Sequence, residues 1–356
     1  MDEGLPAVSE EDVISGIRYL LDVVRSEGKP MVLLLGLGTN LGDHDGNSAL
    51  GAYLAELSDR NGLVIAVPAG NEAISAHHFF GDATAGSSYT DVEINVAEGV
   101  TGFVAELWGK IPRGYEVSLI TPTGEVSARV SSGLDTSGDI SFRLVETVAS
   151  ISYLTFTQSG LTQMIFIRLK DPASGTWRIR VYKNSEYADG FHIWLPINGF
   201  LTGEVSFTKP DPGVTVTEPG NVGSVITVSG YRYQDDVRYS PSGRGPMRGG
   251  GLKPDITAPG VDILGPAVYQ GSFLFPARTE ATFTRRSGTS AATAFVAGAC
   301  AQILEWGYVK GNLPIMNTRI AAGLLYSGAE SVKNEDLPND EWGYGTLNVY
   351  RSILEA

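Results

Sequence analysis

Two short, wholly apolar runs constrain the fold of this chain more than any other feature of its sequence. Residues 31–35 (MVLLL) and 63–67 (LVIAV) are too short to be helices of their own, and such runs are typical of strands buried on both faces of a parallel sheet. Each run follows a segment, residues 13–24 or residues 50–57, whose apolar residues recur at helical spacing. This alternation of helix and strand predicts an α/β layer with right-handed crossovers.

The middle of the chain has a different pattern. Between residues 75 and 215, about eight short segments of alternating apolar and polar residues are separated by turn residues, which favours a β-sandwich, most simply a jelly roll. The helical pattern returns only after the Pro-Gly pairs at 212–213 and 219–220. We therefore expect residues 1–74 and 216–356 to form the two parts of an α/β domain, with residues 75–215 as an all-β domain inserted between them.

A run of small residues near the C-terminus contains the first candidate site residue. Residues 287–301 (SGTSAATAFVAGACA) indicate a tight loop that leads directly into a buried helix. At this junction Ser290 has its hydroxyl at the positive end of the helix dipole, beside unpaired N–H groups that can hold an oxyanion. Ser290 is therefore a candidate nucleophile. From this segment alone, a helix cap formed by Thr289 or Ser290 is the simpler interpretation.

Asn71 is the second candidate site residue. It follows the apolar run 63–67, and ligands gather at the carboxyl ends of the strands in open α/β sheets. The Asn71 amide is therefore placed to donate a hydrogen bond to a substrate. The alternative is that Asn71 serves only the backbone of its glycine-containing turn.

Composition argues against several classes of partner. The 26 basic and 40 acidic residues give a net charge of −14, which argues against nucleic acid and against a membrane surface. We find no secretion signal and no apolar run of roughly 18 to 20 residues, the length that a membrane span needs. No cofactor and no metal site are expected, because the acidic loop residues are interpreted as solvated; these are Asp43, Asp45, Asp235 and Asp236. The one cysteine, Cys300, is interpreted as a buried small hydrophobe.

Five short segments, in a fixed order along the chain, together resemble the motifs of the subtilisin-like serine proteases (subtilases, peptidase family S8). They are residues 36–38 (GLG), 69–72 (AGNE), 253–260 (KPDITAPG), 288–290 (GTS) and 343–345 (GYG). The resemblance covers residues 8–74 and about 216–353. It implies a subtilisin-like parallel sheet with helices on both faces.

The resemblance also implies a role for each candidate residue. Ser290 would be the nucleophile of a serine endopeptidase, and Asn71 would stabilise the oxyanion. The implied substrate-binding residues are Gly36, Leu37, Gly38, Ala69 and Gly70. Ser287 stands where the family usually has Asn, and residues 294–295 (AF) stand where it has Pro-His, which favours a degenerate paralogue. The retention of Ser290 and Asn71 favours an active enzyme.

Finer features resemble one branch of the family, the clostridial germination proteases of the Csp type. They are residues 38–46 (GTNLGDHDG), the β-rich insertion, and residues 305–307 (EWG) followed by 311–312 (GN). This resemblance implies a protein substrate, the zymogen of a spore cortex hydrolase, and a sister Csp-type protein as a partner. It also implies a cytoplasmic or spore-associated location. The alternative is a catalytically inactive pseudoprotease that acts as a germination sensor or scaffold.

The histidine and aspartate of a catalytic triad are not identifiable in the sequence. A serine nucleophile needs a histidine base and an aspartate to orient it, and the family's motifs for both would precede the helix that begins at Ser9. Residues 135–138 (DTSG) match the aspartate motif only superficially, because they lie inside the inserted domain. None of the four histidines is followed by the family's Gly-Thr-His pattern; they are His44, His77, His78 and His192. We therefore expect the C-terminal portion of a subtilase, with a sheet incomplete at its N-terminus and no activity alone.

Overall fold

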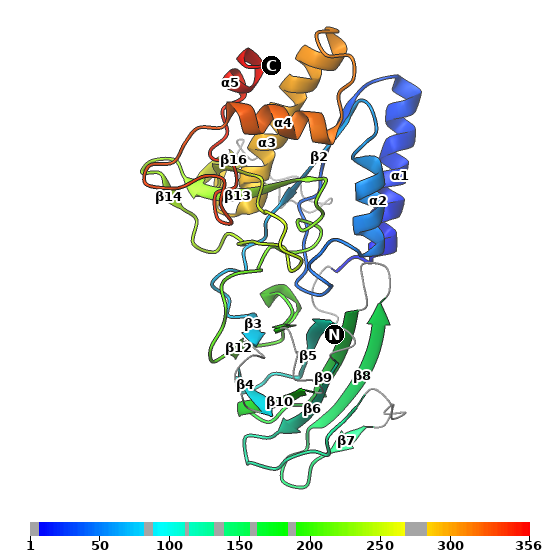
Figure 1. The fold of residues 1–356 in the computed structure, drawn as a ribbon, viewed down its shortest axis with the longest axis vertical. Coiled ribbons are helices and arrows are strands. Elements are labelled where there is room, and N and C mark those ends of the chain that lie inside the picture. Colours follow the sequence, from blue (N-terminus) through cyan, green and yellow to red (C-terminus); the bar gives the residue numbers. More distant parts are fainter. Residues whose placement is uncertain are drawn as a thin grey trace, which may run out of the picture.

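The computed structural model describes residues 7–81, 88–110, 114–131, 139–156, 162–183, 190–267 and 283–356. Figure 1 shows two parts: an α/β body in the upper half of the view and an antiparallel β-sandwich in the lower half. The blue N-terminal segments and the orange and red C-terminal segments both belong to the body, whereas the sandwich comes from the middle of the chain.

The body is built on a parallel sheet. β1 (Met31–Leu34), β2 (Leu63–Pro68) and β13 (Ile226–Arg232) lie side by side in that order, and β15 (Ile256–Pro259) pairs parallel with β13. β14 (Val237–Arg238) adds a short antiparallel pair to β13. The two apolar runs therefore form neighbouring parallel strands, as their sequence predicted.

Helices cover both faces of this sheet because alternate side chains of β2 point in opposite directions. The helices are α1 (Glu10–Glu27), α2 (Ala49–Leu57), α3 (Thr289–Leu304), α4 (Thr318–Gly328) and α5 (Val349–Leu354). Leu63, Ile65 and Val67 pack in one core with α1 and α2, while Val64 packs in a second core with α3 and α4. Every position of β2 is buried, so one apolar strand contributes to two cores. The prediction of helices on both faces is confirmed.

The ends of α1 follow the rules for helix capping. The Ser9 hydroxyl accepts a hydrogen bond from the backbone N–H of Asp12 at 3.1 Å, and Gly28 ends the helix in the left-handed conformation with φ of 65°. The remaining elements of the body are a hairpin of β16 (Ile263–Pro266) and β17 (Phe283–Arg286) and the π-helical turn η2 (Glu305–Val309).

The sandwich consists of two antiparallel sheets. In the described residues, the four-stranded sheet has the order β12 (Val205–Phe207), β4 (Tyr89–Val96), β10 (Gly175–Lys183) and β6 (Tyr115–Ile120). The six-stranded sheet has the order β3 (His78–Gly81), β11 (Phe191–Trp194), β5 (Gly102–Lys110), β9 (Thr162–Lys170), β8 (Val148–Phe156) and β7 (Ile140–Ser141). A short 3₁₀ turn, η1 (Asn198–Phe200), follows β11.

One apolar core lies between the two sheets. Trp177 of β10 and Ile165 of β9 are among its fully buried members, and burial alternates along β10 and along the second half of β9. A β-sandwich with one solvated and one buried face per sheet is what the alternating sequence pattern indicates. Its jelly-roll topology and the exact domain boundaries stay predictions.

Two expectations from composition can be compared with the structure. Cys300 is fully buried in α3, and this burial raises the pKa of its thiol to about 12. The interpretation of Cys300 as a buried small hydrophobe is therefore confirmed. None of the helices in the described part of the chain combines the length and the hydropathy that crossing a membrane requires.

A stack of aromatic rings joins the sandwich to the body. The imidazole of His44, in the loop after β1, lies parallel to the indole of Trp194 on β11, with ring centroids 4.0 Å apart. The two ring nitrogens of His44 lie 3.0 Å from the backbone carbonyls of Asn40 and Val216, and the neutral ring donates its one N–H to one of them. The Trp194 indole N–H in turn donates to the carbonyl of Val214 at 3.2 Å. These contacts fix the sandwich beside the loop that follows β1.

The buried imidazole of His44 predicts a loss of stability in acid. Burial is the main cause that lowers the pKa of His44 from 6.5 to about 4, so the unfolded chain gains a proton below about pH 6.5 that the folded chain does not. The stabilisation is complete above pH 6.5 and decreases by about 1.4 kcal/mol per pH unit as pH falls toward 4. Denaturant unfolding at several pH values checks this. His44→Gln should show a shallower pH slope whatever its absolute stability, and parallel curves for the two proteins would contradict the account.

Candidate active site

The candidate nucleophile, Ser290, lies in the first turn of α3. The helix begins directly after Gly288, a glycine that no other residue replaces easily. Gly288 is the N-cap of α3, with φ of 153° and ψ of 160°, a conformation that L-residues rarely adopt. It makes no side-chain cap, and its N–H donates to the carbonyl of Gly260 at 2.8 Å. Thr289 and Ser290 therefore lie inside the helix, so the interpretation of either residue as its N-cap is wrong.

Asn71 is held by the start of α3. Its side-chain Oδ1 accepts hydrogen bonds from the backbone N–H of Thr289 at 3.0 Å and from the Thr289 hydroxyl at 3.3 Å. Because the oxygen of the amide is fixed in this way, the Nδ2 group must point away from Thr289. Among the described residues, Asn71 Nδ2 has no acceptor, and the side chain is exposed. The interpretation of Asn71 as serving only its own turn does not account for this contact across 218 residues.

Ser290 directly follows Thr289, the residue whose N–H binds the Asn71 amide. It is exposed, and neither its hydroxyl nor its backbone N–H forms a hydrogen bond within the described part of the chain. Ser290 and Asn71 are thus brought together at the carboxyl end of β2, where each contributes one unpaired N–H donor. An exposed hydroxyl beside two fixed donors at a helix N-terminus suits attack on a carbonyl and stabilisation of the resulting oxyanion.

The segment that follows β1 has free backbone groups. The last sheet contact of this strand is the hydrogen bond from the Leu35 N–H to the Ala66 carbonyl, at 3.2 Å. Pairing resumes at Thr39, which forms an antiparallel bridge with Glu218. Between them, the backbone groups of residues 36–38 have no hydrogen-bond partner among the described residues. An extended peptide can pair with such a segment as an added strand.

Ala69 and Gly70 are placed differently from residues 36–38. Ala69 is fully buried, its N–H donates to the Val228 carbonyl at 2.9 Å, and its carbonyl accepts from the Thr217 N–H at 3.1 Å. The Gly70 carbonyl accepts from Gly243 N–H at 2.9 Å and from the Thr289 hydroxyl at 3.2 Å. Their backbone groups therefore shape the turn that carries Asn71.

Comparison with known proteins identifies the family. The subtilase family model matches residues 202–345. The structure is similar to that of the Clostridium perfringens CspB protease, with a TM-score of 0.85 and 30% sequence identity over 99% of this chain and 71% of CspB. The chain belongs to the subtilase family. It is also 34% identical to the serine protease AprX of Bacillus subtilis (strain 168) over 148 residues, which is 39% of this chain and 32% of AprX. The chain thus spans about a third of AprX and 71% of CspB.

None of the four histidines of this subtilase forms a hydrogen bond with Ser290. His44 and His78 use both ring nitrogens elsewhere: His78 contacts the Asp211 carbonyl at 3.1 Å and the ring of His192 at 2.9 Å. The ring of His77 contacts the Glu72 carboxylate at 2.7 Å in a buried pair. Residues 135–138, the superficial aspartate motif, lie outside the described residues.

Two of the four acidic loop residues are not simply solvated, so that prediction was wrong for them. Asp43 is half-buried and accepts a hydrogen bond from Asn47 Nδ2 at 2.6 Å. Asp45 forms an ion pair with Arg248 at 2.8 Å, with both side chains largely buried. Their partners include a residue from a distant part of the chain, which local sequence cannot show. The described residues contain no cluster of three or more side chains suited to hold a metal ion.

The sequence analysis missed Thr217 and Glu218. They lie between the two walls of the site, which are residues 36–38 and the turn of residues 69–71. Thr217 packs against Gly38 and Gly70, and Glu218 pairs with Thr39. Glu218 is buried, and this burial, together with the nearby Asp43 carboxylate, raises its pKa to about 8. The only local signal was a polar pair directly before the turn at Pro219 and Gly220.

The segment 253–260 proves to be a structural connection. The ammonium group of Lys253 is fully buried and bonds the Asp255 carboxylate at 2.5 Å and the Val225 carbonyl at 2.8 Å. Asp255 also accepts from Thr227 N–H and from the Tyr326 hydroxyl, both at 2.7 Å. A buried charge needs this degree of pairing, and the pairs connect β13, β15 and α4.

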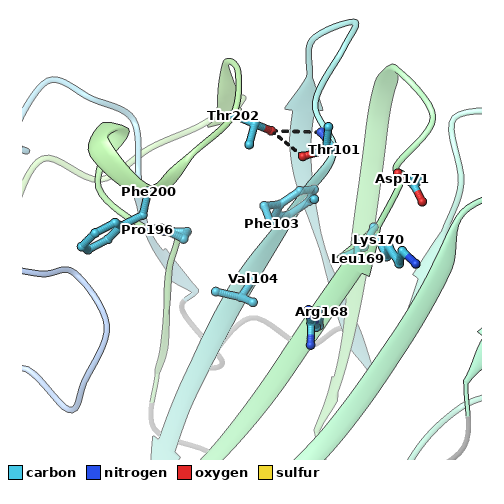
Figure 2. A pocket seen from close by; sticks show the side chains of 11 residues that line it. Thr101, Phe103, Val104, Arg168, Leu169, Lys170, Asp171, Pro196, Phe200 and Thr202 are labelled. Carbon is cyan, nitrogen blue, oxygen red and sulfur yellow. Dashed lines mark hydrogen bonds between the residues drawn. The ribbon is translucent and has the colours of Figure 1, made fainter. Parts of the chain in front are cut away.

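A separate pocket of about 300 Å³ lies on the outer face of the sandwich, and no residue of the candidate site lines it. Figure 2 shows it between Val104 and Arg168 on two neighbouring strands and Pro196, Phe200 and Thr202 on the facing segment. The hydroxyl of Thr202 bonds both the backbone N–H and the hydroxyl of Thr101 at its rim. This pocket is therefore distinct from the region around Ser290.

Replacement of Gly288 tests how the start of α3 is built. Gly288→Ala should lower the free energy of unfolding by about 1–3 kcal/mol because alanine does not tolerate this backbone conformation. The added Cβ itself meets only ordinary contacts with Asn71, at 3.6 Å. Gly298→Ala, in the interior of the same helix with open space around it, is the matched control and should be neutral or stabilising by up to about 1 kcal/mol. Denaturant unfolding gives both values, and equal effects at the two sites would contradict the account.

Proposed function

We propose that this chain is the nucleophile-bearing part of a serine endopeptidase. Ser290 attacks the scissile carbonyl, while Asn71 Nδ2 and the Ser290 N–H hold the oxyanion. The observation that carries the proposal is the hydrogen bond from Thr289 N–H to Asn71 Oδ1, which leaves the amide N–H₂ free beside the exposed Ser290. The similarity to CspB and AprX, which are both proteases, supports the same chemistry.

The general base and its aspartate are proposed to come from outside this chain. The engagement of all four histidines in other contacts supports this. In subtilisin, loss of the histidine base costs about 10⁶-fold in turnover. This chain by itself is therefore expected to have negligible activity.

The substrate is proposed to be a protein that binds as an extended strand. The free backbone groups of residues 36–38 lie at the end of β1, an edge strand in the described sheet. Main-chain pairing at such an edge provides affinity without a particular side-chain sequence. More specifically, we propose a spore cortex hydrolase zymogen as substrate, a sister Csp-type protein as partner, and a cytoplasmic or spore-associated location. This proposal rests on the resemblance of residues 38–46, 305–307 and 311–312 to the Csp-type proteases.

The inserted sandwich is proposed to be a jelly-roll module, with domain boundaries at residues 74–75 and 215–216, that rigidifies the body. Two contacts support this role: the stack of Trp194 on His44, and the hydrogen bond from the Gly42 N–H to Glu106 on β5 at 2.9 Å. Both reach the loop that follows residues 36–38.

A second candidate function is that of an inactive pseudoprotease that senses a germinant or acts as a scaffold. The observation that favours it is that all four histidines form their hydrogen bonds with groups other than Ser290. It predicts binding of a partner without proteolysis. Cleavage that depends on Ser290 would exclude it.

Labelling with a fluorophosphonate tests the proposed nucleophile. The protein expressed from its complete gene should be labelled, Ser290→Ala should abolish the label, and Asn71→Ala should slow labelling by about 10²–10³-fold. Ser287→Ala is the matched control because Ser287 is exposed nearby, and its hydroxyl oxygen only accepts a hydrogen bond from the Asp262 N–H. Labelling that persists in Ser290→Ala, or no labelling of the unaltered protein, would overturn the proposal.

A further inference from the structure

The two residues Thr217 and Glu218 set the spacing between the walls of the candidate site. Glu218 exchanges two backbone hydrogen bonds with Thr39, at 2.9 and 3.0 Å, directly after residues 36–38. Thr217 N–H donates to Ala69 at 3.1 Å, next to the turn of Asn71. A Cβ on Gly38 or Gly70 would lie only 2.6 or 2.5 Å from the Thr217 hydroxyl, so the backbones of both walls approach this side chain closely. Any movement of this dipeptide is therefore transmitted to both walls.

The Glu218 side chain holds the loop that continues from Thr39. Its Oε1 accepts hydrogen bonds from the His44 N–H and from Asn221 Nδ2, both at 3.2 Å. Gly42 packs so closely on this carboxyl that an added Cβ would lie 2.5 Å from Oε1. Asp43 stands between Gly42 and His44, which both contact the Glu218 carboxyl, so its own carboxyl lies near that of Glu218. Two neighbouring buried carboxyl groups cannot both be charged at low cost.

The proton of this pair belongs to Glu218. Burial and the Asp43 charge raise the pKa of Glu218 to about 8. Burial opposes the ionisation of Asp43, but hydrogen bonds from the Asn47 amide and from the backbone of Asp45 and Asn47 outweigh it and lower the pKa of Asp43. At neutral pH the pair therefore consists of a carboxylic acid and a carboxylate.

The charged groups around the pair do not supply a cation to Glu218. Arg248 donates to the Asp43 carbonyl at 2.6 Å and pairs with the Asp45 carboxylate. Glu106 of β5 accepts from the Gly42 N–H, and the His44 ring lies between the carbonyls of Asn40 and Val216. In the described residues, no lysine or arginine contacts the Glu218 carboxyl. A proton on Glu218 is therefore what removes its charge repulsion with Asp43.

We propose that Glu218 is a positioning residue for the peptide-binding segment: as a neutral acid it donates its proton in a hydrogen bond to the Asp43 carboxylate, and this bond holds residues 36–45 beside the turn of Asn71. The inference rests on the proposed function for the meaning of that segment. The positioning itself is a property of the fold. Loss of the proton in alkali leaves two adjacent carboxylates, whose repulsion loosens the loop.

The test is hydrogen–deuterium exchange of the chain at about pH 6.5 and about pH 9.5, corrected for intrinsic exchange rates. We expect the hydrogen-bonded amides among residues 39–45 of the unaltered protein to lose protection by at least about tenfold at the higher pH, because Glu218 is then ionised. Glu218→Gln keeps a donor toward Asp43 that does not titrate, so its protection should be the same at both pH values. Glu218→Ala should lose protection at both. Glu98→Gln, an exposed glutamate of the sandwich, is the matched control and should behave as the unaltered protein.

A second variant keeps the test decisive if Glu218→Gln does not fold. Asp43→Asn removes the neighbouring charge, so the midpoint of the pH-dependent loss of protection should move to lower pH. Identical pH dependence in the unaltered protein and both variants would overturn the proposal. So would a protection of the amides of residues 39–45 that follows added Ca²⁺ and not pH, because a cation and not a proton would then bridge the carboxylates. Absence of fluorophosphonate labelling with the expected exchange pattern would reject the proposed function and leave the positioning role intact.

Discussion

One hydrogen bond between distant parts of the chain organises the candidate active site. The backbone N–H of Thr289, in the first turn of α3, donates to the side-chain oxygen of Asn71 at the end of β2. This contact satisfies one of the unpaired N–H groups of the helix start and also fixes which side of the amide faces Ser290. The same atoms therefore serve packing and chemistry. The glycine before Thr289 is required because the chain must enter the helix abruptly at this point.

Buried polar groups hold the remaining parts of the site in place. Lys253 and Asp255 connect the central strands to α4, and Glu218 and Asp43 connect the loop after β1 to the segment before β13. A buried charge or carboxyl without partners would cost several kcal/mol, so each group restricts the arrangements that the chain can adopt. The sandwich adds a third restraint through the stack of Trp194 on His44. The site is thus defined by long-range polar contacts on a scaffold of apolar strands.

Sequence was sufficient for the scaffold and for the neighbourhood of the site. Short, wholly apolar runs are typical of buried strands, and helical spacing of apolar residues predicted the helices that cover them. Asn71 follows such a strand and Ser290 lies at the start of such a helix, and the family resemblance implied that they act together. The sequence could not show that Asn71 Oδ1 is already occupied, that Asp45 pairs with Arg248, or that Glu218 faces Asp43. These contacts join residues far apart in the chain, and no local pattern encodes them.

The central claim is that Asn71 is fixed by the start of α3, and amide exchange at Thr289 tests it most directly. The N–H of Thr289 in the unaltered protein should be protected, because Asn71 Oδ1 accepts its hydrogen bond at 3.0 Å. In Asn71→Ala this N–H loses its acceptor, and its exchange, followed by NMR at a pH where both proteins are folded, should accelerate by at least about tenfold, as the loss of roughly 1.4 kcal/mol implies. Equal protection of the Thr289 amide in the two proteins would contradict the account.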